Sequence, residues 1–239
     1  RVLVLGLGGG AITKRYWRDY PQVSIDSVEI DPVVVDVAET YFGLPDDPRL
    51  RTFTEDARRY VQRTDETYDV VIVDAYYSDS LPFHLTTDEF LREVKSRMSP
   101  DGVIAYNVIS SAEGEGSDLF RSMYRTASGV WDRLWVFPIG YGTDAADGNA
   151  SSAAEVRRNI IVLGSDIELT ETELRERIES RADGMVTMEG FARFAEDTAA
   201  RRQLTLERDA WRAMCTLLTQ TRARVHELLE ETERERDGM

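Results

Sequence analysis

The sequence predicts an α/β fold built around one sheet in which most strands run parallel. Three features of the 239-residue chain support this prediction. Short apolar runs alternate with helix-like segments at the spacing of β-α-β units. A glycine-rich loop follows the first apolar run and precedes a helix, as it does where an α/β sheet binds a nucleotide. Later, two strands follow each other without a convincing helix between them, so we expect them to pair antiparallel.

Most of the seven expected strands are short apolar runs, as parallel strands buried on both faces are. They are Val2–Leu5, Val23–Ile30, Arg51–Thr54, Tyr68–Asp74, Val103–Val108, Leu134–Ile139 and Asn159–Leu163. A mostly parallel sheet of seven strands whose last strand is antiparallel is typical of the Rossmann-like, S-adenosylmethionine-methyltransferase type. That ending separates it from an ordinary dinucleotide-binding fold.

Helix signals lie between these strands. The expected helices are Ile12–Tyr20, Pro32–Phe42, Ala57–Arg63, Thr86–Met98 and Asp118–Val130. Pro32 suits a first helical turn, and Gly43 suits a helix end. Thr86, with Glu89 three residues later, forms a capping-box pattern. The run Pro100–Gly102 predicts a turn before the fifth strand.

We expect a nucleoside-binding Rossmann-like domain over residues 1–165 and a helical C-terminal extension over residues 166–239. Within the first, Gly140–Glu155 is rich in Gly, Ala, Asp and Ser and predicts a loop. The extension carries an amphipathic stripe at seven-residue spacing, formed by Leu204, Trp211, Leu218 and Val225. This stripe either packs on its own domain or forms the seam of a homodimer, and the sequence leaves both open.

The composition excludes some partners. The formal net charge of -15 argues against binding to nucleic-acid phosphates or anionic lipid. The single cysteine, Cys215, excludes an intrachain disulfide. No apolar run approaches the roughly 18 residues of a membrane helix. Because Arg1 already lies inside an apolar strand, we expect this chain to be a fragment of a longer protein, whose remainder is open to a membrane segment. We expect the domain itself to be cytoplasmic.

Gly6, Gly8 and Gly10 form the candidate cofactor loop. They follow a buried strand and precede a helix, where missing side chains let a cofactor approach the backbone. The helix N-terminus also offers free N–H groups and a partial positive charge. Gly6, Gly8 and Ala11 satisfy the dinucleotide pattern G-x-G-x-x-G/A as well. The loop alone therefore leaves NAD and S-adenosylmethionine open as ligands.

Acidic residues follow the next expected strands, and the carboxyl ends of parallel strands meet in one crevice. Glu29 is the candidate ligand of a ribose diol, whereas Asp31, just before Pro32, is interpreted as a helix cap. Asp56 follows the third strand, where a carboxylate can accept the exocyclic amine of adenine and also cap the next helix. An acid at this third position favours S-adenosylmethionine enzymes over NAD enzymes.

Asp74 is the candidate catalytic residue. It ends an apolar strand, where a carboxylate is costly unless it is used or solvated, and beside a sulfonium it could take a proton from an attacking amine. Its alternative role is to cap or brace the following loop. In that loop, Tyr76 and Tyr77 are candidate walls of the cleft. Asp79 and His84 are candidate substrate contacts, although His84 could equally brace the turn. We expect no metal.

Four segments resemble the spermidine synthase (polyamine aminopropyltransferase) family in order and spacing. They are Val2–Gly10, Val28–Pro32, Thr54–Ala57 and Tyr68–Asp74, within a resemblance that covers roughly residues 1–165. The resemblance implies that Glu29 binds ribose, that Asp56 binds the adenine amine and that Asp74 deprotonates the acceptor amine. It implies S-adenosylmethionine or its decarboxylated form as co-substrate and a small-molecule amine as acceptor. The segment Asp79–Thr87 is most similar to spermidine-synthase-like domains fused to membrane segments.

Two acids of that family are replaced in this chain. Gly9 stands where the family has an Asp that holds the aminopropyl amine, and Tyr77 stands where it has a second Asp after the fourth strand. Three functions therefore stay open. They are aminopropyl-type transfer to an amine, methyl transfer to another acceptor, and nucleoside binding without catalysis in a membrane-associated protein.

Overall fold

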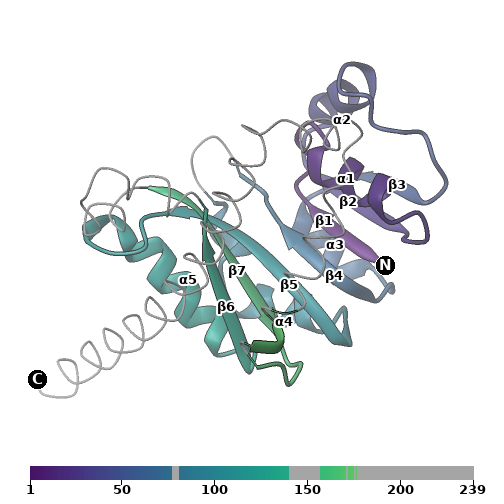
Figure 1. The fold of residues 1–239 in the computed structure, drawn as a ribbon. Helices are drawn as coiled ribbons and strands as arrows, with labels where there is room; N and C mark the ends of the chain where they lie inside the picture. The colour runs from purple at the N-terminus through teal and green to yellow at the C-terminus, as the bar shows by residue number, and fades with distance from the viewer. Residues whose placement is uncertain (77–80, 140–156, 171, 175, 177–239) are drawn as a thin grey trace, which may run out of the picture. The chain divides into compact units, whose positions relative to one another are not determined.

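Seven strands form one sheet at the centre of the computed structural model, which describes residues 1–76, 81–139, 157–170, 172–174 and 176 (Figure 1). The strands are β1 (Val2–Leu5), β2 (Ile25–Glu29), β3 (Leu50–Thr54), β4 (Tyr68–Val73), β5 (Met98–Ser110), β6 (Arg133–Pro138) and β7 (Arg158–Ser165). They lie in the order β3-β2-β1-β4-β5-β7-β6. The first five strands in this order, β3, β2, β1, β4 and β5, run parallel to one another, and β7 is antiparallel to both β5 and β6. The predicted methyltransferase-type sheet is confirmed, including its antiparallel last strand.

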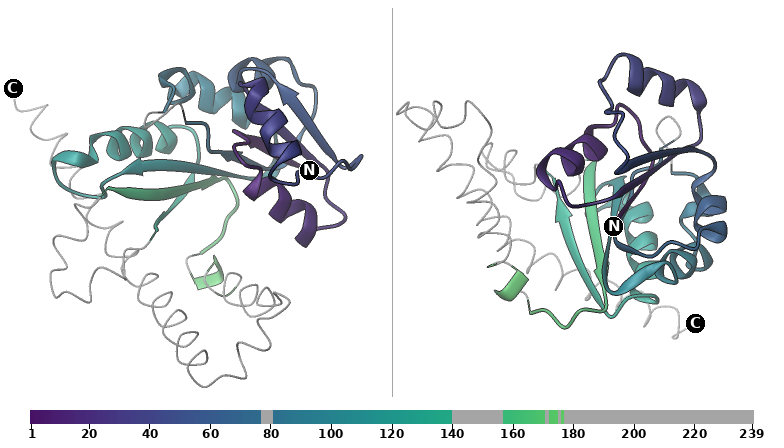
Figure 2. Two further views of the ribbon diagram at one scale, coloured as in Figure 1. Left: turned by 90° about the horizontal axis from the view of Figure 1, so that it is seen from above. Right: turned by 90° about the vertical axis from the view of Figure 1, so that its right-hand side faces the viewer.

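Helices connect the strands at the predicted places. In the described part of the chain they are α1 (Ala11–Asp19), α2 (Pro32–Thr40), α3 (Ala57–Arg63), α4 (Asp88–Lys95) and α5 (Asp118–Ser128), with 3₁₀ turns η1 (Phe83–Leu85) and η2 (Glu115–Ser117). Ala105 of β5 packs in the same cluster as α1, whereas its neighbours Ile104 and Tyr106 face the side of α4 and α5. Successive strand residues point to opposite faces, so helices cover both sides of the sheet (Figure 2).

Strand β1 lies inside the sheet and is buried along its whole length. Val2 and Val4 pack with Ile12 of α1, and the alternate residues Leu3 and Leu5 are fully covered on the other face. The strand also has a parallel partner on each side, β2 and β4. A continuous apolar run is therefore what this position requires.

The start of α4 corrects the predicted cap. Thr87, rather than Thr86, caps the helix, because its Oγ1 accepts a hydrogen bond from the N–H of Phe90 at 3.2 Å. The Thr86 hydroxyl instead donates to the carbonyl oxygen of Phe83 at 2.7 Å. The 3₁₀ turn η1 ends at Thr86, so the hydroxyl of this residue is used by that turn rather than as the cap of α4.

The turn predicted at Pro100–Gly102 is also wrong. Strand β5 continues from Met98 to Ser110, but its register against β4 shifts, since Tyr68 pairs with Met98 and Val70 pairs with Val103, so that residues 99–102 bulge from the ladder. This irregularity accommodates the residues that are typical of a turn within the strand. A Cβ at Gly102 would lie 2.9 Å from the carbonyl oxygen of Ser99, so the bulged strand requires a glycine there.

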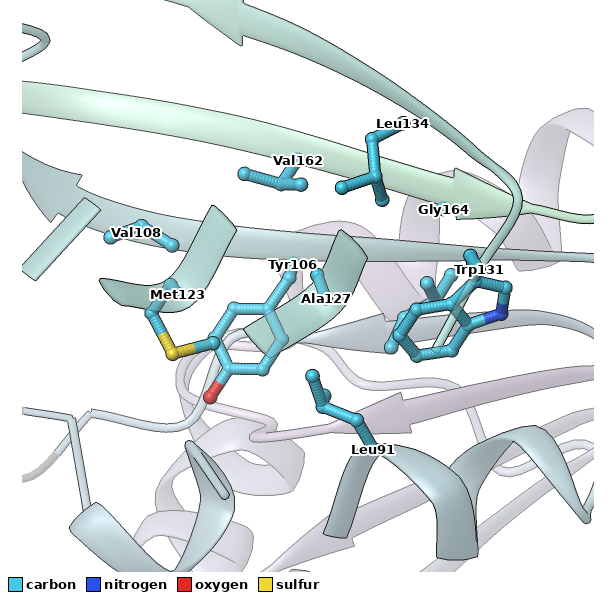
Figure 3. Close-up of a pocket in the computed structure, with 10 residues that line it drawn as sticks. Leu91, Tyr106, Val108, Met123, Ala127, Trp131, Leu134, Val162 and Gly164 are labelled. Carbon is cyan, nitrogen blue, oxygen red and sulfur yellow. The ribbon is translucent and has the colours of Figure 1, made fainter. Parts of the chain in front are cut away.

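A small apolar gap lies between α4, α5 and the sheet (Figure 3). Its walls include Leu91, Tyr106, Met123, Trp131 and Val162. The free volume of about 10 Å³ has room for at most about one water molecule, and the walls are apolar. The gap contains none of the predicted site residues, and we interpret it as a packing space of the core.

Several predicted features lie outside the described residues. They include the loop Gly140–Glu155 and the seven-residue stripe of the C-terminal extension. The division of the chain at residue 165 and a homodimer through the extension therefore stay predictions. Within the described ranges, the helices are too short or too polar to cross a membrane.

Candidate functional site

The predicted site residues follow the carboxyl ends of four neighbouring strands. β1 and β4 lie side by side, while the chain connects β1 outward to β2 and β4 outward to β5 in the opposite direction. Such a switch point opens a crevice where α/β sheets bind their ligands. The loop Gly6–Gly10 follows β1, Glu29 ends β2, Asp56 follows β3 and Asp74 follows β4. The structure therefore brings these four parts of the predicted site to the same edge of the sheet.

Backbone geometry explains the glycines of the loop. At Gly6 the φ angle is 100°, and a Cβ would lie 2.2 Å from the carbonyl oxygen of Asp74. Any side chain at Gly6 would thus push apart the two loops that flank the switch point. At Gly8 the φ angle is 52°, and no atom of the described residues lies within 4 Å of a Cβ built there. Gly10, with a φ angle of 71°, is the N-cap of α1. The loop therefore presents bare backbone at Gly8.

The Glu29 carboxylate lies against the glycine loop. Its Oε2 accepts hydrogen bonds from the backbone N–H groups of Leu7 at 3.0 Å and Gly8 at 3.3 Å. Its Oε1 accepts from the N–H of Asp31 at 3.2 Å. A carboxylate offers about four acceptor positions, so Glu29 keeps capacity for a further donor. The Asp31 carboxylate accepts from the N–H of Val33 at 2.8 Å, which confirms its predicted role as the cap of α2.

Asp56 makes one local and one distant contact. Its Oδ1 accepts a hydrogen bond from the N–H of Arg59 at 3.0 Å, so it caps α3 as predicted. Its Oδ2 lies 2.9 Å from Nε2 of His84, which comes from the segment after β4. Burial acts to raise the pKa of Asp56, but the hydrogen bonds from Arg59 and His84 outweigh it and hold that pKa below its ordinary value. Asp56 is therefore an ionised acceptor, and His84 braces it.

Asp74 contacts the side-chain amide of Asn107, a residue that was not predicted from the sequence. Nδ2 of Asn107 in β5 donates a hydrogen bond to Asp74 Oδ1 at 2.8 Å. The backbone N–H of Asp74 donates to the carbonyl oxygen of Leu5 at 2.8 Å, which continues the ladder between β4 and β1. Oδ1 of Asn107 is buried and has no hydrogen-bond partner among the described residues. An amide inside the apolar run Val103–Val108 was the signal that could have identified Asn107.

Tyr76 is tied to β5 by its hydroxyl group. The hydroxyl donates to the carbonyl oxygen of Asn107 at 3.0 Å and accepts from the N–H of Ile109 at 2.7 Å. Burial raises the pKa of Tyr76 to about 12, and the negative charge of Asp74 adds to the rise. The polar end of this side chain is therefore used by the protein itself, which leaves the ring as a candidate wall. Tyr77, like Asp79, lies outside the described residues.

Two exposed apolar side chains lie beside the polar groups of the site. Ile30, directly after Glu29, is 64% exposed, and Phe42 is 54% exposed. The Phe42 ring would be 3.4 Å from a Cβ placed on Gly9. Apolar walls next to a few polar groups are typical of ligand sites. Sequence reasoning missed both residues, because apolar residues at the end of a strand or helix look like core positions.

Residues 1–76, 81–139 and the described part beyond 157 offer no ready set of metal ligands. No group of three or more His, Cys, Asp or Glu side chains there is arranged to hold an ion. The polar groups of the site are instead backbone N–H groups, carboxylates, one imidazole and one amide. Such a set suits an uncharged sugar and base together with a cation that faces the carboxylates.

Comparison with known proteins points to one family. Residues 1–124 match the family model of the Spermine/spermidine synthase domain. A Polyamine aminopropyltransferase of Vibrio vulnificus is 38% identical over 129 residues, which make up 52% of this chain and 43% of that protein. The chain therefore spans less than half the length of this relative. These relatives do not support the predicted similarity of this chain to domains fused to membrane segments.

Solved structures have the same fold. Human Methyltransferase-like protein 13, solved in complex with SAH, matches with a TM-score of 0.60 and 26% identity, over 73% of this chain and 77% of that chain. A probable spermidine synthase from Corynebacterium glutamicum matches with a TM-score of 0.60 and 24% identity, over 71% of this chain and 57% of that chain. The family model covers more than half of the chain, and the folds agree with it. The chain belongs to the spermine/spermidine synthase domain family.

Proposed function

We propose that this domain is an aminopropyl-type transferase that binds a sulfonium nucleoside at the switch point and transfers a group from it to an amine. The observation that carries the proposal is the place of Asp74. This carboxylate follows the central strand β4, and its backbone touches the glycine loop at Gly6. A base for an incoming amine is needed at the point where the loop would hold the donor. Membership of the family and the transferase names of its relatives agree with this role.

The nucleoside half of the proposed site uses residues from three strand ends. Glu29 accepts a hydroxyl group of the ribose, because its Oε1 accepts only one hydrogen bond within the protein, from the N–H of Asp31. Asp56 accepts the exocyclic amine of adenine, for which an ionised, acceptor-only group is suited. The exposed side chain of Ile30 supplies an apolar wall for the purine ring. The donor in this proposal is S-adenosylmethionine or its decarboxylated form, and no metal is needed.

The transfer step balances without any further reactant. The lone pair of the amine attacks the carbon next to the sulfonium, and a C–N bond forms as the C–S bond breaks. The sulfur keeps the electron pair of that bond and leaves as a neutral thioether nucleoside. Asp74 takes the proton that the amine loses. The hydrogen bond from Asn107 holds one carboxylate oxygen, which leaves the second oxygen for the proton.

Asn107 orients the proposed base. Its Nδ2 holds Oδ1 of Asp74 at 2.8 Å, while its own Oδ1 is buried and has no hydrogen-bond partner among the described residues. A cytoplasmic location is part of the same proposal, because a single cysteine that forms no intrachain disulfide suits a reducing compartment.

A second candidate is methyl transfer from S-adenosylmethionine. The observation that favours it is the surroundings of Gly9, where the Phe42 ring lies 3.4 Å from the position of a Cβ and the Lys14 ammonium lies 5.9 Å from the centre of that ring. A cation rather than a carboxylate thus lies near this part of the loop, which suits the tail of S-adenosylmethionine, with its carboxylate, better than a tail that ends in an ammonium group alone. The likeness to the human methyltransferase agrees with this alternative.

Product analysis with both donors tests the proposal. The full chain is incubated with each sulfonium donor and a panel of amines, and the products are identified by mass spectrometry. An aminopropylated amine together with methylthioadenosine supports the proposal. A methylated acceptor together with S-adenosylhomocysteine supports the second candidate. Tight nucleoside binding without turnover on any amine would contradict both and indicate a non-catalytic domain.

A further inference from the structure

The contact between His84 and Asp56 joins two segments that are distant in the sequence. Asp56 follows β3, and His84 lies in the 3₁₀ turn after β4. The atoms Nε2 of His84 and Oδ2 of Asp56 are 2.9 Å apart, and the two side chains are 35% and 24% exposed. The pair is therefore partly shielded from water, and the imidazole reaches one of the carboxylates assigned above to the nucleoside.

The imidazole is held in place from several sides. The carbonyl oxygen of His84 accepts a hydrogen bond from Nη1 of Arg58 at 3.2 Å. Arg58 also makes a bidentate contact with Glu93 of α4, at 2.8 and 2.9 Å. On the other side, the hydroxyl of Tyr106 donates to the carbonyl oxygen of Leu85 at 3.0 Å. The backbone that carries the ring is thus tied to α3 and β5 directly and to α4 through Arg58, so the ring can move only by rotation of its own side chain.

This arrangement fixes both the direction and the charge of Asp56. One oxygen is held by the N–H of Arg59 and the other by His84. These two contacts occupy about half of the acceptor positions of a carboxylate. The remaining positions can only accept, because the pKa of Asp56 is held below its ordinary value against the effect of burial. A group of this kind distinguishes an amino substituent on a purine from a carbonyl oxygen.

We propose that His84 is a positioning residue that sets the nucleobase preference of the site, selecting a 6-aminopurine over a 6-oxopurine. The inference rests on the proposed nucleoside role of Asp56. A purine amine donates to the fixed carboxylate, whereas a 6-oxo group faces it with a second acceptor and repels it. Without His84, the carboxylate can rotate or accept a proton, and it then tolerates the oxo group better. A residue that only braces the fold would change the affinity for both bases alike.

The test compares methylthioadenosine with its 6-oxo counterpart, methylthioinosine, by titration calorimetry on the full chain. His84→Leu removes the ring donor while keeping the bulk, and His84→Gln keeps an N–H donor at similar reach. Phe83→Ala is the control for ring packing, because Phe83 lies in the same turn, is 81% exposed and meets the His84 ring edge-on with 5.9 Å between the ring centroids. Thermal unfolding of each variant checks the fold. Should His84→Leu be unstable, His84→Phe supplies a ring without a donor in its place.

We expect the unchanged protein to bind methylthioadenosine at least about tenfold more tightly than methylthioinosine, as the loss of one charged hydrogen bond implies. His84→Leu should reduce this ratio about tenfold, whereas His84→Gln and Phe83→Ala should retain it. A ratio that stays constant in His84→Leu, with both affinities kept or both lowered, overturns the inference alone. An unchanged protein that binds neither nucleoside overturns the proposed function and this inference together.

Discussion

Asp74→Asn removes the proposed base while disturbing the surrounding structure very little. The two side chains have the same size and shape, and an Asn oxygen can still accept the 2.8 Å hydrogen bond from Asn107. The variant loses the negative charge and the oxygen that takes the proton. A positioned general base contributes about 10²–10⁴-fold to a rate, which corresponds to about 3–5 kcal/mol in the activation free energy. We expect turnover to fall by this factor.

Tyr76 provides an independent measure of the charge that is removed. Burial, with a smaller contribution from the charge of Asp74, raises the pKa of this phenol to about 12. In Asp74→Asn the contribution of the charge is lost and that of burial remains. The pKa of Tyr76 should therefore fall, yet stay above the ordinary value of about 10. Ultraviolet titration, with Tyr76→Phe used to assign the signal, measures this shift.

The assay separates binding from chemistry. Calorimetry gives the dissociation constant of methylthioadenosine, and single-turnover experiments with donor and amine give the rate of the chemical step. We expect the dissociation constant of methylthioadenosine to change little and the rate of the chemical step to fall. Asp101→Asn, which removes the same charge at an exposed position of β5, is the control and should behave like the parent. If Asp74→Asn turns over at the parental rate, Asp74 is only a loop brace, and the methyltransferase and non-catalytic functions move ahead.

Three further substitutions test other parts of the structure. Glu29→Gln should weaken nucleoside binding by about 10–100-fold, with less effect on the rate of bound donor, because an amide presents only one acceptor oxygen; calorimetry measures this. Gly6→Ala should lower the free energy of unfolding by about 3 kcal/mol or more, since its Cβ would lie 2.2 Å from the carbonyl oxygen of Asp74 at a φ of 100°. Parental stability in urea would contradict that geometry. Asp26 is fully buried, and burial acts to raise its pKa, but the hydrogen bonds from Arg51 and a tyrosine outweigh this and lower it. Its stabilisation is thus complete above about pH 4 and is lost as the pH falls through the lowered pKa; Asp26→Asn should flatten this acid dependence in denaturation curves.

Local signals made much of the fold predictable from the sequence. Asp31 and Asp56 each precede a helix, and a carboxylate at such a place has N–H donors within two or three residues. The glycines at Gly6, Gly8 and Gly10 likewise lie between a buried strand and a helix, so their backbone role follows from their neighbours. Features that depend on a few adjacent residues can be inferred without knowing the tertiary structure.

Features that depend on distant residues could not be inferred. The hydrogen bond between Asn107 and Asp74 requires β5 to lie beside β4. An amide within an apolar strand does not indicate which residue it will contact. The pairing of His84 with Asp56 is equally remote in the chain. The choice of Thr87 over Thr86 as a cap was missed for a smaller reason, since the preceding 3₁₀ turn already uses the first hydroxyl.

The proposed nucleoside acids differ from the proposed base in how firmly they are held. Glu29 accepts from two N–H groups of the glycine loop, and Asp56 accepts from Arg59 and His84. Each can therefore receive a ligand hydrogen bond without first being ordered, so little side-chain entropy is lost on binding. Within the described part of the chain, Asp74 accepts one side-chain hydrogen bond, from an amide whose own oxygen lacks a partner there. A rigid nucleoside half and a less constrained acceptor half allow the transferred group and the acceptor to change while the nucleoside stays the same, which is consistent with aminopropyl and methyl transferases sharing this fold.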